Sequence, residues 1–480
     1  MRAIELKNVS FSYSGFADKV LSDVDFYVDY GEVALLSGLS GEGKSTLLSI
    51  VSGIIPNIVK GDITGEVLVD GKTIIGQKLA AVCRKVGVVL QNADSQIIHK
   101  TVDDEIAFGC ENFALASNKI GEQIERVCTI VELDKTAGTR TLSGGQKQRL
   151  ITASTLATGQ RILILDEPLA NLDVESANLL MDTLRQLAKA GYAVLIVEHR
   201  LDMVLPFVDS VWNIRAGVVT KIGNKQEYLL SQTVAIEDNS DDHARGAKIF
   251  DVENVAFSIK KKEILKDVSF EVYEGERLLL LGENGCGKTT LMRLLARLNK
   301  PTKGEIVQTL DKKFGKRYCG KKWFKSVGVV YQNPNYQLFM PTVEQEIAFG
   351  AVSKEYAEEM IKLFGLEHLR KRHPQSLSEG QKRRVSIAAV AATNPKVLLL
   401  DEPTVGQDYK GLCELVKILD MLHDKSGNTM ITVTHDMRCA EALCDRAILI
   451  ADGTVKEQGG KELAHRYFFD KKSDTGVSNA

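Results

Sequence analysis

The chain carries short apolar runs that each end abruptly in polar residues. The first half contains VALLSG at 33–38, ILILDEP at 162–168 and AVLIVEH at 193–199; the second half contains LLLLGE, VLLLDEP and TMITVTH in the same order. Runs of four or five apolar residues are typical of strands buried on both faces of a parallel sheet, where chemistry gathers at the C-terminal strand ends. The pattern therefore predicts an α/β fold with functional residues directly after the strands.

The same series of elements occurs twice along the chain. Each half opens with an amphipathic strand pair, beginning at Ile4–Tyr13 and Phe250–Ile259, and places a helical segment after its first apolar run. Lys44 and Lys288 stand 244 residues apart at matching positions. We therefore expect two domains, residues 1–232 and 248–480, joined by a polar, turn-rich linker at 233–247.

Composition narrows the class of protein. The 480 residues are 44% hydrophobic, enough for two cores, and no apolar stretch approaches the ~20 residues of a membrane span. A net charge of −2 and a pI near 6.5 argue against nucleic-acid binding, which depends on concentrated Lys and Arg. The N-terminus lacks a secretory apolar core, and the eight cysteines show no CxxC pair, so we expect a reduced, cytosolic chain.

Two glycine-rich loops, GLSGEGKST and GENGCGKTT, follow an apolar strand and precede a helix. Backbone N–H groups of such a loop converge on phosphate, and glycine permits the positive φ that this requires. Lys44 and Lys288 would reach the β- and γ-phosphates, while Ser45 and Thr289 would ligate Mg²⁺. A glycine-rich turn with a chance lysine is the alternative, which two copies in the same setting disfavour. The loop residues expected to bind nucleotide are Gly38, Leu39, Ser40, Gly41, Glu42, Gly43, Lys44, Ser45 and Thr46, and Gly282, Glu283, Asn284, Gly285, Cys286, Gly287, Lys288, Thr289 and Thr290.

Acidic pairs end the next apolar run in each half. Asp166 and Asp401 follow four apolar residues, where a carboxylate needs a cation or a donor, so we expect them to hold Mg²⁺. Glu167 and Glu402 come next and suit a general base that polarises the attacking water. A solvated acidic pair is the alternative, and its position after a buried strand weakens it.

One histidine ends the following apolar run of each half. His199 and His435 come 33 and 34 residues after the Asp of their half, where each could orient water and the γ-phosphate. A single histidine is more often structural, but the paired occurrence favours a catalytic role.

Two further motifs identify a family resemblance. LSGGQ at Leu142–Gln146, LSEGQ at Leu377–Gln381, and the glutamines Gln91 and Gln332 join the loops, acids and histidines in one order in both halves. Together they resemble the nucleotide-binding domains of ABC proteins over essentially the whole chain, with LSGGQ the most discriminating motif. The resemblance implies two tandem P-loop ATPase domains, each with a mainly parallel core sheet, an antiparallel strand subdomain and a helical subdomain.

In that family two domains pair head to tail, so that each ATP lies between the phosphate loop of one domain and the signature of the other. The resemblance implies an intramolecular pair in this chain, with Gln91 and Gln332 as Mg²⁺ ligands. The signature residues implied to close the two sites are Ser143, Gly144, Gly145 and Gln146 opposite Lys288, and Ser378, Gly380 and Gln381 opposite Lys44.

Three positions depart from the pattern or add to it. Glu379 replaces a signature glycine and places a carboxylate near a triphosphate, unless it points away. Tyr13 could stack on adenine as in family members, or be a half-buried strand aromatic; Ile259 stands at its position in the second half. Cys286 precedes a helix N-terminus, whose amides would lower its thiol pKa; the alternative is a small residue that the loop tolerates.

The segments after Gln91 and Gln332 indicate the class. They read QNADSQIIHKTVDDEIAFG and QNPNYQLFMPTVEQEIAFG, with Thr101 and Thr342 expected as N-caps of a helix. This form is similar to ATPases of energy-coupling-factor transporters, which import vitamins and transition-metal ions.

The resemblance implies an integral membrane coupling subunit and a small membrane substrate-binding subunit as partners, at the cytoplasmic face of the cell membrane. The alternatives are the ATPase of a sugar importer, or a soluble tandem ABC motor acting on ribosomes or nucleic acid. Ribosome-associated members typically carry a long charged helical linker, and this chain has none.

Overall fold

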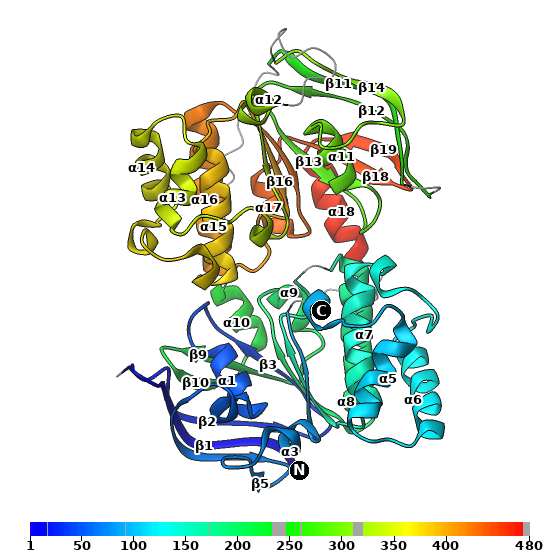
Figure 1. Ribbon diagram of the computed structural model, residues 1–480, viewed down its shortest axis with the longest axis vertical. Coiled ribbons are helices and arrows are strands. Elements are labelled where there is room, and N and C mark those ends of the chain that lie inside the picture. The colour runs from blue at the N-terminus through cyan, green and yellow to red at the C-terminus, as the bar shows by residue number, and fades with distance from the viewer. Residues whose placement is uncertain are drawn as a thin grey trace. The chain divides into compact units, whose positions relative to one another are not determined.

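The computed structural model describes residues 1–16, 18–91, 93–170, 172–232, 246–259, 262–310 and 320–473. The chain divides into two compact units, Met1–Thr233 and Val234–Ala480, here called unit 1 and unit 2 (Figure 1). Most of the linker predicted at 233–247 lies outside the described residues, so its bounds stay a prediction. Within the described ranges, no helix is long and apolar enough to cross a membrane.

The part of unit 1 that the structure describes contains two sheets. A four-stranded antiparallel sheet has the order β2-β1-β4-β5, and a six-stranded sheet has the order β10-β9-β3-β8-β7-β6. In the second sheet all neighbours run parallel except β10, an antiparallel edge strand beside β9. The strands are β1 (Arg2–Tyr13), β2 (Leu21–Asp29), β3 (Val33–Ser37), β4 (Gly61–Val69), β5 (Lys72–Thr73), β6 (Val86–Val89), β7 (Ile162–Asp166), β8 (Ala193–Val197), β9 (Ser210–Arg215) and β10 (Val218–Ile222).

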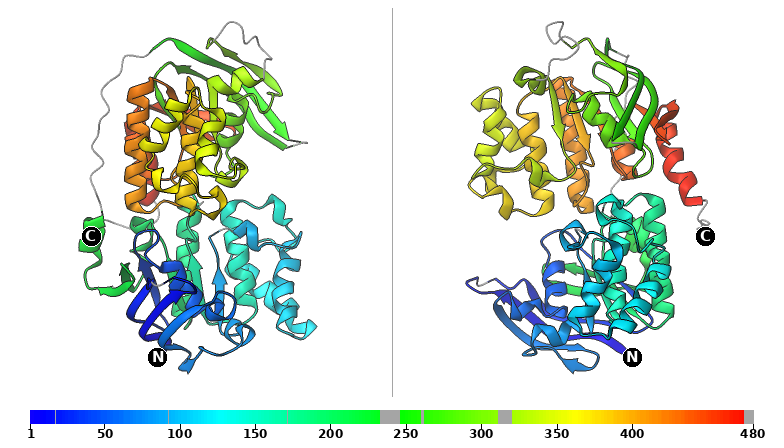
Figure 2. Two further views of the ribbon diagram at one scale, coloured as in Figure 1. Left: turned by 60° about the vertical axis from the view of Figure 1, so that its left-hand side comes forward. Right: turned by 45° about the vertical axis from the view of Figure 1, so that its right-hand side comes forward.

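Helices cover the core sheet of unit 1 and form a group beside it. Helices α5 and α6 pack on α7, on the side of the unit away from the antiparallel sheet (Figures 1 and 2). The helices are α1 (Lys44–Val51), α2 (Ile54–Asn57), α3 (Leu79–Cys83), α4 (Ala93–Gln96), α5 (Val102–Asn112), α6 (Ser117–Ile130), α7 (Gly144–Ala157), α8 (Val174–Lys189), α9 (Leu201–Val204) and α10 (Lys225–Gln232), with a 3₁₀ turn at Thr139–Thr141.

Unit 2 repeats this plan: its described residues form one nine-stranded sheet, ordered β14-β11-β12-β19-β18-β13-β17-β16-β15. Its antiparallel part joins the core through a single pair, Asp267 with Thr454. The strands are β11 (Lys248–Ile259), β12 (Lys262–Tyr273), β13 (Arg277–Leu281), β14 (Lys303–Gln308), β15 (Val327–Val330), β16 (Val397–Asp401), β17 (Thr429–Val433), β18 (Arg446–Ala451) and β19 (Thr454–Gly459).

The helices of unit 2 are again divided between the core sheet and a separate group. Helices α13 and α14 pack with α15, away from the strands β11, β12 and β14 (Figure 2). Among the described residues of unit 2, the helices are α11 (Lys288–Leu295), α12 (Lys321–Ser326), α13 (Val343–Gly350), α14 (Lys354–Leu363), α15 (Glu379–Ala391), α16 (Tyr409–Ser426), α17 (Met437–Ala442) and α18 (Lys461–Ser473), with 3₁₀ turns at Pro334–Tyr336, Glu367–Leu369 and Pro374–Ser376.

The apolar runs form the central strands because both of their faces are covered. Every residue of β3, β8, β13 and β17 is buried, as expected for parallel strands between helices and a second layer. In unit 1 the inward side chains of the antiparallel sheet, such as Phe11 and Phe26, join Leu36 and Leu47 in one core. The predicted α/β class, with its antiparallel and helical parts, is confirmed.

Candidate active site

The phosphate loop of unit 1 connects β3 to α1. Gly38 has φ +150°, and a Cβ at this position would lie 2.4 Å from the carbonyl oxygen of Ile214, so only glycine fits. The buried Lys44 Nζ donates to the carbonyl oxygens of Gly38 and Leu39 at 2.7 and 2.8 Å. The ammonium is therefore held at the mouth of a loop whose backbone can cradle an anion.

The loop of unit 2 is built alike. Lys288 Nζ donates to the carbonyl oxygens of Gly282 and Glu283 at 2.6 and 2.8 Å. The Thr289 hydroxyl donates to both carboxylate oxygens of Asp401, at 3.3 and 3.1 Å. The structure thus brings together two of the three residues that the sequence predicts as Mg²⁺ ligands in this unit, Thr289 and Asp401.

In unit 1, Glu167 contacts two other predicted site residues, Gln91 and His199. Its backbone N–H donates to Val197 at 2.8 Å and its φ is +46°, so the chain turns sharply after β7. Gln91 Nε2 donates to Glu167 Oε2 at 2.6 Å, and His199 Nε2 lies 3.2 Å from Oε1. The carboxylate expected to act as the base is therefore linked to both the glutamine and the histidine.

In unit 2, Glu402 occupies the same turn, with a φ of +51°. Its backbone N–H donates to the carbonyl oxygen of Val433 at 2.9 Å. Its Oε1 lies 3.4 Å from His435 Nε2, and its Oε2 accepts the backbone N–H of His435 at 3.2 Å. The ring Nε2 also lies 3.0 Å from Asn284 Oδ1 in the phosphate loop. The base, the histidine and the loop of this unit form one contiguous set.

The aspartates at the strand ends have perturbed pKa values. Burial, followed by the charge of Glu167, raises the pKa of Asp166 to about 6, although Lys44 opposes the shift. Burial also raises the pKa of Asp401, against the Thr289 hydrogen bond and the charge of Lys288. A buried carboxyl group with this bias favours a cation as its partner. Carboxylate and hydroxyl oxygens are the donors that Mg²⁺ prefers, so the residues present fit that ion.

The two signatures form the N-termini of α7 and α15. Ser143 Oγ accepts the Gln146 N–H at 3.3 Å, and Gln146 Oε1 accepts the Ser143 N–H at 2.9 Å. Ser378 and Gln381 make the same capping box at 3.3 and 3.1 Å. The signature serine and glutamine thus build the helix start, whose amide groups favour a negative charge. The pairing of each signature with the other unit's loop stays a prediction.

The structure shows the surroundings of the three positions that depart from the family pattern or add to it. Glu379 pairs with Lys382 one turn along α15, at 2.9 Å, so its charge is compensated within its own helix. The Tyr13 hydroxyl lies 2.9 Å from Thr46 Oγ1, which places the ring beside the phosphate loop. Ile259 is exposed at the end of β11 and offers no aromatic face.

The expected low pKa of Cys286 is wrong. Burial of the thiol raises its pKa, and this effect outweighs the charge of Lys288 and the backbone hydrogen bonds that lower it. The side chain lines a cavity of about 540 Å³ beside the second phosphate loop, together with Ile264, Asp452 and Tyr467.

Sequence reasoning missed two buried residues that support the site. Arg383 in α15 donates to the carbonyl oxygens of Tyr331, at 2.7 Å, and Gln332, and so ties the signature helix to the glutamine loop. Burial lowers its pKa to about 10. Glu198 precedes His199 and is buried in unit 1. For Glu198 the available signal was a carboxylate directly after a continuous apolar run; Arg383 stands in a basic run, Lys382–Arg384, which gave no such signal.

Comparisons with known proteins agree with this geometry. The ABC transporter family model matches residues 21–170 and 265–405. A putative ABC transporter ATP-binding protein of Treponema denticola is 31% identical, over 95% of this chain and 96% of that protein. The putative HMP/thiamine import ATP-binding protein YkoD of Bacillus subtilis is 32% identical, over 94% of this chain and 90% of that protein.

Solved structures share the fold. The archaeal ribosome recycling factor aABCE1, in complex with the ribosomal stalk protein aP1, superposes with a TM-score of 0.67 at 21% identity, covering 96% of this chain and 92% of that one. At this identity the likeness concerns the fold alone. The family match in both halves and the full-length relatives place this chain in the ABC transporter family, as an ATPase with two ATP-binding domains in tandem.

Proposed function

We propose that this chain is the energy-coupling ATPase of a membrane importer of the energy-coupling-factor type, for a vitamin or a metal ion. It would bind at the cytoplasmic face of the cell membrane to an integral membrane coupling subunit, accompanied by a small substrate-binding membrane subunit. The relative named as an HMP/thiamine import protein supports an import role.

The observation that carries the proposal is a pair of apolar surfaces after Gln91 and Gln332. Docking surface 1 consists of Ile98, 68% exposed, and the exposed Phe108. Docking surface 2 consists of Phe339 and Phe349, 65% and 67% exposed, whose rings meet edge to face at 5.4 Å. Aligned positions in two units expose large apolar side chains, which indicates partner surfaces.

A buried glutamate fixes each of these surfaces. Glu105 Oε2 accepts the backbone N–H groups of Ile98 and His99 at 2.8 and 2.7 Å. Glu346 Oε2 accepts those of Phe339 and the following residue at 2.8 and 2.7 Å. Both carboxylates are buried, so each loop is held in place while its apolar side chain faces outward.

A second glutamine ties each loop back to the core sheet. Gln96 accepts from the N–H of Leu90 at 2.7 Å and donates to Val88 at 3.3 Å. Gln337 makes the same two bonds with the chain around β15, both at 2.8 Å. A movement imposed on either docking surface is therefore transmitted to the end of β6 or β15, next to Gln91 or Gln332.

The catalytic part of the proposal follows from the contacts inside each unit. Glu167 and Glu402 would act as general bases toward water, with His199 and His435 orienting the reacting groups. The two units would pair so that each ATP lies between a lysine loop and the signature of the other unit. Mg²⁺, held by the oxygen donors described above, would neutralise charge on the transferred phosphate.

The test removes docking surface 2 without touching the catalytic residues. Each ring exposes on the order of 130 Å², so its burial contributes roughly 2–3 kcal/mol. Phe339→Ala with Phe349→Ala should weaken binding to inverted membrane vesicles of the source cells by about a hundredfold or more. Met421→Ala, an exposed apolar residue in α16, is the matched control and should bind like wild type.

Flotation of the chain with vesicles and ATP binding in solution are the two measurements. We expect the double variant to lose flotation and to bind ATP normally. Equal flotation of both variants, or sedimentation of the wild-type chain with ribosomes instead of vesicles, would contradict the importer assignment.

A further inference from the structure

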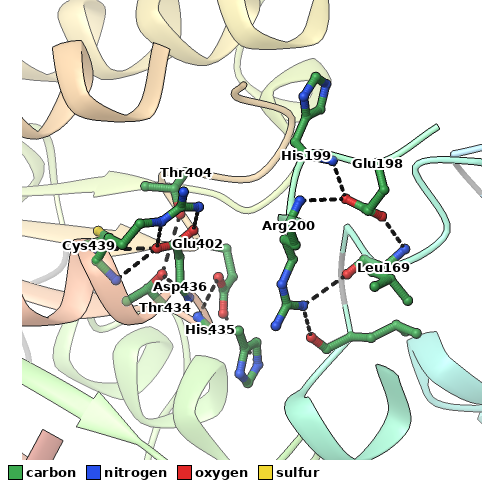
Figure 3. Close-up of polar contacts among 12 residues, drawn as sticks. Leu169, Glu198, His199, Arg200, Glu402, Thr404, Thr434, His435, Asp436 and Cys439 are labelled. Carbon is green, nitrogen blue, oxygen red and sulfur yellow. Dashed lines mark hydrogen bonds and ion pairs between the residues drawn. The ribbon is translucent and has the colours of Figure 1, made fainter. Parts of the chain in front are cut away.

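Glu198 joins two separate segments of the first active site. It is 2% exposed, and its Oε1 accepts the backbone N–H groups of His199 and Arg200 at 2.8 and 3.2 Å. Its Oε2 accepts the N–H of Leu169 at 3.0 Å, two residues after Glu167 (Figure 3). One carboxylate thus spans the chain after the base and the chain that carries the histidine.

The neighbouring arginine strengthens the same junction. Arg200 Nη1 donates to the carbonyl oxygens of Leu169 and Leu172, at 3.2 and 2.9 Å (Figure 3). The segment after Glu167 is therefore held by a carboxylate at its N–H and by a guanidinium at its carbonyl groups. Hydrogen bonds to charged groups are the stronger kind, so this junction is stiff.

In unit 2 the corresponding two segments are joined by different residues. Thr434 and Thr404 stand at the positions of Glu198 and Leu169, and their hydroxyl oxygens lie 3.4 Å apart (Figure 3). Both positions of the pair have changed together between the two units. Asp436, at the position of Arg200, is turned to its own helix, where it accepts from Arg438 and caps α17.

The difference changes how the two bases are held. In unit 2 the N–H of His435 donates to Glu402 itself at 3.2 Å. In unit 1 the backbone N–H of His199 donates to Glu198 at 2.8 Å. Glu167 accepts a hydrogen bond from the side-chain amide of Gln91 at 2.6 Å. The histidine backbone N–H thus donates to the base in unit 2 and to Glu198 in unit 1, where the base is in contact with Gln91.

We propose that Glu198 is a positioning residue for ATP hydrolysis in the first site. By binding the His199 N–H and the Leu169 N–H, it keeps the His199 backbone N–H away from the Glu167 carboxylate, while the His199 ring stays 3.2 Å from that carboxylate. Glu198 thereby fixes the distance between the base and the histidine ring. The Glu167–Gln91 contact then makes hydrolysis in this site depend on the glutamine loop. This inference rests on Glu167 as the base, and not on the importer assignment.

The experiment measures the first site alone. In the full chain with Glu402→Gln, the remaining MgATP turnover reports unit 1, and Glu167→Gln in the same chain checks that Glu167 is its base. Three variants are made in this Glu402→Gln background: Glu198→Gln, Glu198→Thr, and Leu169→Thr combined with Glu198→Thr. The double change reproduces the pair of threonines found in unit 2.

We expect Glu198→Thr to lower kcat on the order of ten- to a hundredfold and to leave KM for MgATP within about twofold, because the phosphate loop is untouched. The double variant should recover most of the wild-type kcat. The kcat of Glu198→Gln should lie between that of the wild-type residue and that of Glu198→Thr. Thr434→Ala, in a chain with Glu167→Gln, should change kcat less than threefold, since Glu402 is held by the His435 backbone.

Other outcomes would overturn the proposal. An unchanged kcat in Glu198→Thr would show that the junction has no part in hydrolysis. A parallel loss of kcat and of melting temperature with no recovery in the double variant would show a purely structural role. If Glu167→Gln left the residual turnover intact, the assignment of the base would fail instead, independently of Glu198.

Discussion

The strongest quantitative prediction concerns Arg277, at the start of the strand that leads into the second phosphate loop. Its guanidinium is 2% exposed, donates to Asp445 Oδ1 at 3.0 and 2.9 Å, and donates to Asp420 at 2.7 Å. Its backbone N–H also donates to Asp445, at 2.8 Å. Arg277→Met keeps the apolar stem and removes the charge, which leaves two carboxylates without their cation.

Unit 1 provides the matched control. The backbone of Val33, at the position of Arg277, donates to Asp209 at 2.9 Å, and Asp209 pairs with Arg185 from α8. The arginine therefore stands on the helix in unit 1 and on the strand in unit 2, while the aspartate keeps its position directly before β9 or β18. Arg185 is 35% exposed, so water can replace its partner.

This difference in burial sets how much unfolding free energy each variant should lose. Removing one partner of a buried ion pair costs roughly 3–5 kcal/mol, and the partial exposure of both aspartates favours the lower figure, about 3 kcal/mol. An exposed pair such as Arg185 with Asp209 contributes about 0–1 kcal/mol. In a domain of this size the two losses correspond to melting shifts of roughly 6–12 °C and below about 4 °C.

Calorimetry and hydrogen exchange measure the two effects separately. Arg277→Met should lower the transition of unit 2 and raise exchange in β13 on the order of a hundredfold, while β3 is unchanged. Arg185→Met should leave both strands protected. Equal shifts from the two variants, or a loss in unit 1 from Arg277→Met, would refute the argument from burial.

Three further predictions concern catalysis, reactivity and pH. Glu402→Gln should cost more ATPase activity than Glu167→Gln, because in the proposed pairing the site of Lys288 would be closed by the complete LSGGQ signature. Equal residual rates of the two variants would contradict this ordering. The double variant should give a compact ATP-bound chain by light scattering. Cys286 should react slowly with an alkylating reagent at pH 7, since its raised thiol pKa leaves little thiolate, and mass spectrometry of the labelled peptide checks this. Burial lowers the pKa of His423 below 6.5, so the stability it contributes is present above that pH and is lost as pH falls through the folded pKa. His423→Gln should therefore flatten the fall in melting temperature between pH 7 and 5, and an unchanged slope would argue against it.

Much of the fold could be predicted from local patterns. The apolar runs become β3, β7 and β8 and their counterparts in unit 2, because strands buried on both faces need continuous apolar sequence. The expected caps at Thr101 and Thr342 are helix starts, but only Thr342 caps with its side chain, at 3.2 Å from the Gln345 N–H; Thr101 donates to Asp104 instead. A cap position is a local property, and the choice of partner is settled by the neighbouring side chain.

The sequence by itself determined the family and predicted which residues carry chemistry, because glycine loops, strand-end acids and the LSGGQ signature are patterns that can be read along the chain. It could not determine how they are held. Glu198 meets Leu169, 29 residues earlier, and Arg277 meets Asp445, 168 residues later, only because parallel strands bring distant segments side by side. The raised pKa of Cys286 likewise depends on burial by other elements. Contacts across a sheet and the exclusion of water arise from the packed tertiary structure, so they leave little trace in the local order of residues.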